Sequence, residues 1–150
     1  MRWVILLGLA LFPSTEMADD MLAAHNAVRA KLKLPPLVWS GKLAKAAQEW
    51  ADTLLKDGTF RHPATSPWGQ NLLDLYRGQY EPEQVVGDWA AEAANYDYKT
   101  NRCTGMCGHY TQIVWRDTKE VGCALARGGQ REVWACDYSP PGNYQGMRPY

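Results

Sequence analysis

Apolar residues recur every three or four positions along three stretches of the chain, which is the spacing of one helix face. The first stretch covers residues 19–33. Its repeating positions are Leu22, His25, Val28, Arg29 and Leu32. We expect this helix to end at Leu34-Pro35-Pro36, because the residue before a proline avoids the helical region.

The second and third stretches carry terminal signals as well as the periodicity. Residues 41–57 follow Ser40, a good N-cap, and precede Gly58, a good C-terminal residue. The apolar positions of this stretch are Leu43, Ala46, Ala47, Trp50, Leu54 and Leu55. The third helix is expected to begin near Pro82, since proline suits a first helical turn. Its stripe consists of Val85, Trp89, Glu92 and Tyr96.

Short β-type runs bounded by turn residues predict three strands. Val121–Arg127 and Glu132–Tyr138 would form a hairpin across Gly128-Gly129, and Gly69–Leu73 would form another strand. A short helix is expected after Gly108, and the tail SPPGNYQGMRPY should be an ordered irregular segment on the surface. This order of elements predicts an α+β domain in which helices cover an antiparallel sheet.

The N-terminal residues MRWVILLGLALFPSTEMA have the pattern of a secretory signal. Arg2 precedes the apolar run from Trp3 to Phe12. This run is too short to span a bilayer, which requires about 20 apolar residues. We expect residues 1–18 to be a signal peptide cleaved after Ala18, and residues 19–150 to form a single domain. An ordinary buried N-terminal helix is the alternative.

Charge is balanced, with 16 basic and 16 acidic residues. Removal of residues 1–18 takes away one of each sign, Arg2 and Glu16, so the remaining chain stays neutral. Bulk charge therefore suggests neither nucleic acid nor an acidic membrane surface as a partner.

All four cysteines lie in the C-terminal third of the chain, at positions 103, 107, 123 and 136. An even number of cysteines in a secreted chain favours disulfides, and four cysteines allow three pairings. We favour the neighbour pairs Cys103–Cys107 and Cys123–Cys136. A zinc–thiolate site is the rival, although the spacings of 3, 15 and 12 residues fit no compact zinc module.

Two kinds of titratable residue could carry chemistry. Glu92 occupies a core-like position in its stripe, where a buried carboxylate needs a partner, unless the position is at a solvated rim. His62 and His109 are on loops or helix starts, where histidines bind divalent metals or act as acids and bases, although structural hydrogen bonding is more common. His25 is expected in a buried polar network with Asn26 and Arg29. The chain has no HExxH, nucleophile-elbow or phosphate-loop motif.

Eight ordered segments together resemble the CAP superfamily of cysteine-rich secretory, insect venom and plant pathogenesis-related proteins. They are HNAVR (25–29), PPLVWSGKLAKAAQEWA (35–51), GQNL (69–72), WAAEAANYDY (89–98), CGHYTQIVW (107–115), VGCA (121–124), CDY (136–138) and PPGNY (140–144). The resemblance covers roughly residues 20–150. It implies an α-β-α sandwich around a small antiparallel sheet, with a cleft that holds two histidines and two acidic residues.

Matched by motif, the cleft residues are His62, Gln70, Glu92 and His109. The family usually has glutamate where this chain has Gln70, and an amide holds no charge and takes up no proton. The substitution counts against carboxylate-assisted catalysis and leaves metal binding by the two histidines. The chain also lacks a further cysteine pair of plant members, consistent with the loss of one bridge. The tail of this chain, residues 140–150, has an arrangement that in plant relatives is similar to a released signalling peptide.

The resemblance implies a secreted binding module for a sterol or other small lipid, with a cleft for a divalent metal such as zinc. The alternatives are a defence or signalling protein that acts through a protein partner or its C-terminal peptide, and a metal-assisted hydrolase or protease. No covalent nucleophile with a paired base is evident, so we favour a non-enzymatic function over the enzyme. We further expect a monomer without a transmembrane anchor, extracellular, or periplasmic in a Gram-negative host.

Overall fold

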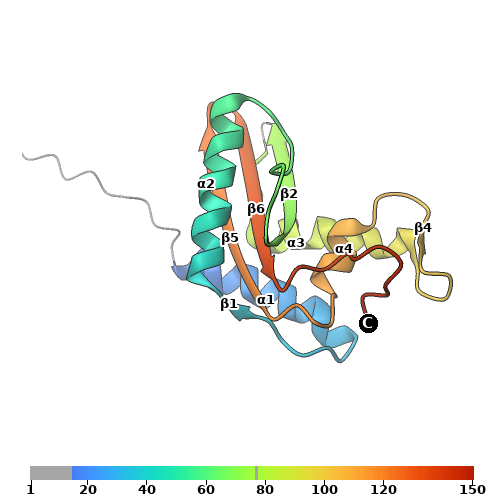
Figure 1. Ribbon diagram of the computed structural model, residues 1–150. Helices are drawn as coiled ribbons and strands as arrows, with labels where there is room; N and C mark the ends of the chain where they lie inside the picture. Colours follow the sequence, from blue (N-terminus) through green and yellow to red (C-terminus); the bar gives the residue numbers. More distant parts are fainter. Residues whose placement is uncertain (1–14, 77) are drawn as a thin grey trace, which may run out of the picture.

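The computed structural model describes residues 15–76 and 78–150, and within them four strands form one mixed sheet (Figure 1). The strand order is β1 (Val38–Trp39), β5 (Glu120–Gly128), β6 (Arg131–Ser139) and β2 (Gly69–Tyr76). The β5–β6 and β6–β2 pairs are antiparallel, and the short β1 pairs parallel with β5. A separate two-stranded ladder joins β3 (Tyr96–Asp97) to β4 (Arg102–Cys103).

Helices cover both faces of the sheet. Helix α2 (Gly41–Asp57) lies along β5 and β6, whereas α1 (Thr15–Lys31), α3 (Pro82–Ala91) and α4 (Gly108–Ile113) gather away from it (Figure 1). A 3-10 turn, η1 (Glu92–Asn95), continues α3. The predicted α-β-α sandwich is confirmed, as are the hairpin and the short helix expected after Gly108, which begins at Gly108 itself. None of the helices in the described residues is long and apolar enough to cross a membrane.

Local signals account for most element boundaries. Ser40 Oγ accepts a hydrogen bond from the Leu43 N–H at 3.2 Å, and Gly58, at φ 66°, closes α2 by donating its N–H to Leu54 O. Helix α1 begins at Thr15 rather than residue 19, so residues 15–18 of the predicted signal peptide form its start. Residues 1–14 lie outside the described part of the chain. The sequence pattern did not predict β1, β3 and β4, which are two residues each.

Both predicted disulfides, Cys103–Cys107 and Cys123–Cys136, are present. All four cysteines are therefore used, which rules out the rival zinc–thiolate site. The tail lies on the surface as predicted, with Pro149 O accepting from Arg116 N at 2.7 Å and Tyr150 stacked on Tyr98.

Strand β6 separates two apolar cores by simple alternation. Val133 and Ala135 face α2, whereas Trp134, Cys136 and Tyr138 face α1 and α3. The α2 side is built from small residues, which lets the helix lie close to the sheet. Its core consists of Ala47, Ala51, Leu54, Leu72, Ala124, Ala126, Val133 and Ala135.

The opposite side contains the predicted polar network. Arg29, 1% exposed, donates from Nη1 to the Ile113 and Trp115 carbonyls at 2.9 and 2.8 Å, which ties α1 to the end of α4. His25, fully buried, contacts Met21 O through Nδ1 and the Tyr138 hydroxyl through Nε2. Asn26 exchanges hydrogen bonds with the Leu37 backbone. These residues join segments that are far apart in the sequence.

We predict that Gly122→Ala destabilises the fold by about 1–3 kcal/mol, because an added Cβ would overlap Ala44 N and lie 2.5 Å from the Ser40 carbonyl oxygen. Chemical unfolding measures the change. Gly87→Ala on α3 is the control, since its Cβ would meet nothing within 4 Å. This control should stabilise the protein by up to about 1 kcal/mol through helix propensity. Equal effects of the two substitutions would contradict the close packing of α2.

A second prediction concerns pH. Burial lowers the pKa of His25 from 6.5 to about 4, so stability that is present above pH 6.5 is lost toward pH 4. Burial raises the pKa of Asp137 from 3.8 to about 6, so its contribution is present below pH 3.8 and lost as pH rises through 6. Each term amounts to roughly 2 kcal/mol between about pH 7 and 4.5, with opposite sign.

The wild-type protein should therefore lose less stability on acidification than Asp137→Asn, by about 2 kcal/mol over that range. Urea unfolding of both proteins at the two pH values measures the difference. Parallel pH profiles would mean that Asp137 titrates alike in the folded and unfolded chains.

Candidate functional site

Glu92 and His109 form a close pair where α3 and α4 meet. Glu92 follows the last residue of α3, and His109 lies in the first turn of α4. The Glu92 Oε2 atom is 2.9 Å from His109 Nδ1, and Oε1 also accepts from the His109 backbone N–H at 3.2 Å. The carboxylate is 11% exposed, so the partner that the sequence required for Glu92 is His109. Trp89 stacks on the imidazole with ring centroids 5.8 Å apart.

His62 pairs with Gln70 in a second group. His62 lies in the segment between α2 and β2, and its Nδ1 atom is 2.9 Å from Gln70 Oε1. Gln70 Nε2 in turn donates to Asp137 Oδ1 at 2.9 Å. Gln70 on β2 and Asp137 on β6 are direct partners in the antiparallel register.

Asp137 is the site residue that the sequence analysis missed. It lies in the apolar run of β6 and is 2% exposed. Burial raises its pKa to about 6, an effect that the Gln70 hydrogen bond and the His62 charge partly offset. The available signal was a lone carboxylate inside a predicted strand, which needs a partner for the same reason as Glu92.

Strand β2 links the two pairs. Asn71, next to Gln70, donates to the His109 carbonyl at 3.0 Å and to the Tyr138 hydroxyl at 3.1 Å. The four predicted residues thus lie in two pairs, and the ligand atoms of His62, Glu92 and His109 do not gather within 4.8 Å of one another. A shared metal would require the two imidazoles to approach.

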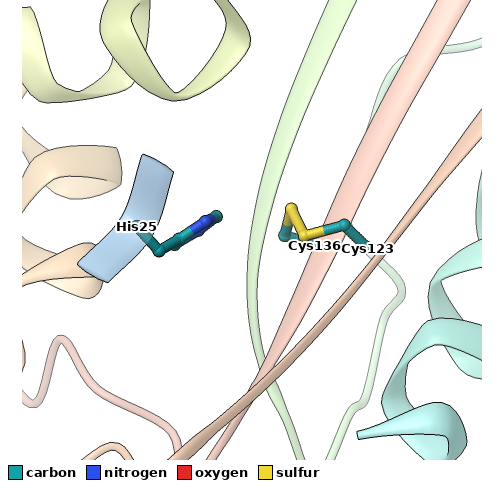
Figure 2. A group of neighbouring side chains, drawn as sticks. All are labelled: His25, Cys123 and Cys136. Atoms are coloured by element: carbon teal, nitrogen blue, oxygen red, sulfur yellow. A yellow bond between two sulfur atoms is a disulfide. The ribbon is translucent and has the colours of Figure 1, made fainter. Parts of the chain in front are cut away.

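Within the described residues, the three side chains that do gather are His25, Cys123 and Cys136 (Figure 2). The two sulfurs are bonded to each other, so neither is a thiolate. Both His25 nitrogens are also engaged, with Met21 O at 2.7 Å and Tyr138 Oη at 2.8 Å. This group is part of the core.

The two imidazoles of the site are each held in one orientation by a hydrogen bond at Nδ1. His62 and His109 each have an acceptor at Nδ1, and in the described part of the chain no hydrogen bond involves Nε2 of either ring. Metal-binding histidines have this arrangement, in which the second nitrogen donates to a carboxylate or carbonyl. The donor set therefore fits a borderline cation such as zinc.

A pocket of about 260 Å³ lies beside the His62 group, between α2 and residues 63–68. Trp50, Trp68 and Pro67 supply apolar wall, and Gln70 and Asp137 supply polar atoms. A second pocket of about 280 Å³ is bounded by α4 and the tail, including Trp115 and Tyr144. Both are concave surfaces of mixed polarity.

Comparison with known proteins identifies the family and agrees with the fold. The model of the cysteine-rich secretory protein family (CAP) matches residues 22–138. Pathogenesis-related protein 1 of Arabidopsis thaliana is 38% identical over 97% of this chain and 91% of its own length. Pathogenesis-related leaf protein 4 of Solanum lycopersicum is 39% identical over 97% and 92%.

Solved structures show the same fold. Venom allergen-like protein 4 of Schistosoma mansoni has a TM-score of 0.74 at 30% identity, over 90% of this chain and 94% of that one. The crystal structure of NaASP2 with Zn2+ has a TM-score of 0.75 at 22% identity, over 91% and 86%. On the family match and the plant relatives together, the chain belongs to the cysteine-rich secretory protein (CAP) family.

Proposed function

We propose that this chain is an extracellular, monomeric, defence-type binding protein, with a divalent-metal cleft at His62 and His109 and an adjacent site for a small lipid. Membership of a secretory family and similarity to plant pathogenesis-related proteins support the defence-type, extracellular assignment. Nothing in the comparisons supports the periplasmic alternative.

The observation that carries the metal proposal is the shared orientation of the two imidazoles. Both use Nδ1 for an internal acceptor, Glu92 for His109 and Gln70 for His62, which leaves Nε2 for a cation. NaASP2, which has the same fold, was solved with Zn2+, which makes zinc a reasonable cation to test here. We propose a moderate affinity for the metal, because only one carboxylate adjoins the two histidines and the two rings must approach each other to share a cation.

The lipid proposal rests on the pocket beside Gln70. Its Trp50 and Trp68 walls suit an apolar ligand, and the Gln70 and Asp137 side chains suit one hydroxyl or carboxyl group. At about 260 Å³ it is slightly below the common range of ligand pockets, roughly 300–1,000 Å³. We therefore propose that it holds part of a sterol or one acyl chain rather than enclosing a large lipid.

The alternatives have weaker support. A hydrolase would need a positioned nucleophile or metal-bound water, and neither cleft histidine is hydrogen-bonded to a hydroxyl or thiol in the described residues. A released tail peptide would first have to separate from the domain. Thr111 Oγ1 donates to Asn143 Oδ1 at 2.6 Å and Gly142 N donates to Gln112 Oε1 at 3.0 Å, so residues 140–150 are packed against the domain.

For the metal cleft, we predict that His62→Ala and His109→Ala each weaken zinc binding at least ten-fold in calorimetry at about pH 7.5. Gln70→Glu should tighten binding, because it restores a carboxylate beside His62. Unfolding midpoints of all variants well above the assay temperature serve as the folding control. Equal zinc affinity in wild type and both alanine variants would contradict the metal site.

For the lipid site, we predict that Trp68→Ala lowers retention of a labelled sterol and a labelled fatty acid several-fold in a co-sedimentation assay. Trp68 is half-buried in the pocket wall, so its loss removes apolar contact area from the pocket. Tyr76→Ala, which alters an aromatic residue 74% exposed outside that pocket, is the matched control. Equal retention by the two variants would reject this pocket as the lipid site.

A further inference from the structure

Three side chains form a hydrogen-bonded row from the surface into the core. His62 is exposed, Gln70 is half-buried, and Asp137 is 2% exposed on the central strand β6. The His62–Gln70 and Gln70–Asp137 hydrogen bonds are both 2.9 Å between heavy atoms. Because Gln70 and Asp137 are register partners in the sheet, their backbones hold the inner part of this row in place.

The direction of each hydrogen bond follows from the groups themselves. A side-chain amide has one donating end and one accepting end, whereas an ionised carboxylate only accepts. Asp137 therefore requires the NH₂ group of Gln70, which leaves the Gln70 oxygen facing His62. That oxygen can only accept, so the hydrogen of a neutral His62 must be on Nδ1.

We propose that Asp137 is a positioning residue that acts through Gln70 to hold His62 in the Nδ1–H tautomer, with the Nε2 lone pair available to a cation. The use of His62 Nε2 as a metal ligand rests on the proposed metal function. The tautomer itself is a property of the metal-free protein.

The His109 pair supports this assignment by comparison. Glu92 accepts directly from His109 Nδ1 at 2.9 Å, so a carboxylate sets the same tautomer there without an intermediate. In the His62 row the carboxylate is one hydrogen bond further away, at position 137 in place of position 70. The two histidines thus present equivalent lone pairs, although only His109 has a carboxylate in direct contact with its ring.

The alternative is that Asp137 is only a buried polar group satisfied by Gln70, with no influence on His62. In that case the hydrogen of His62 would follow the preference of the free side chain, which favours Nε2. The tautomer therefore separates a positioning role from a structural one.

The test is nitrogen NMR of the histidine rings in the ¹⁵N-labelled, metal-free protein at about pH 8, where imidazoles are neutral. In wild type, His62 should show a protonated Nδ1 and a bare Nε2. In Asp137→Asn the new amide can donate as well as accept, so Gln70 is free to reverse, and the Nδ1–H population of His62 should fall at least two-fold. His109 is the internal control and should keep its Nδ1–H signal in both proteins.

Gln70→Ala provides a second variant should Asp137→Asn fail to fold, and it should release His62 in the same way. An Nε2–H tautomer for His62 in wild type would overturn the proposal, as would unchanged His62 populations in a folded variant. If the tautomer is as expected and zinc does not bind, the positioning role stands and the proposed metal function fails. If zinc binds although metal-free His62 has the Nε2–H tautomer, the proposed metal function stands and the positioning role of Asp137 fails.

Discussion

Strand β6 is buried on both faces and hydrogen-bonded along both edges, and this constraint organises the rest of the molecule. Residues 132–138 are all buried, although Glu132, Asp137 and Tyr138 carry polar oxygens, besides the indole N–H of Trp134, which donates to Glu132. Each such group needs a partner from a neighbouring element, because an unpaired buried donor or acceptor costs about 1–3 kcal/mol. Glu132 accepts from Arg127, Asp137 from Gln70 and Tyr138 from Asn71. Strands β5 and β2 are thereby bound to β6 by side chains as well as by backbone.

The same requirement builds the site. Asn71 satisfies the Tyr138 hydroxyl and also holds the His109 carbonyl, so the start of α4 is positioned from β2. Gln70, one residue earlier, satisfies Asp137 and reaches His62. Adjacent residues of one strand thus contact both histidines, although 47 positions separate His62 from His109 in the sequence. Strand β2 holds the backbone of His109 and the ring of His62, whereas Glu92 holds the ring of His109.

Most of the fold was predictable because its signals are local. The caps of α2, the proline at the start of α3 and the turn residues that bound β5 and β6 each act within a few residues. The strands β1, β3 and β4 were not, since two residues show no period, and such short strands depend on the partner that they meet. Among the site residues, the burial of Glu92 implied a partner, but His109 as that partner came from family resemblance and not from spacing. Asp137 was missed because strand register, which opposes it to Gln70, is a long-range property.

Asp137 gives a physical reason why this chain has Gln70 where the family usually has glutamate. Two carboxylates in direct contact disfavour each other's ionised form, and one of them would hold a proton. A carboxylate at position 70 would lie within hydrogen-bond distance of the buried Asp137 carboxylate, whereas an amide there donates to Asp137 and accepts from His62. With aspartate on β6, an amide at position 70 is thus the residue type that satisfies both neighbours at neutral pH. The negative charge that a glutamate would place beside His62 is instead on the buried Asp137, and in the proposed positioning role it acts on the imidazole only by orienting the Gln70 amide.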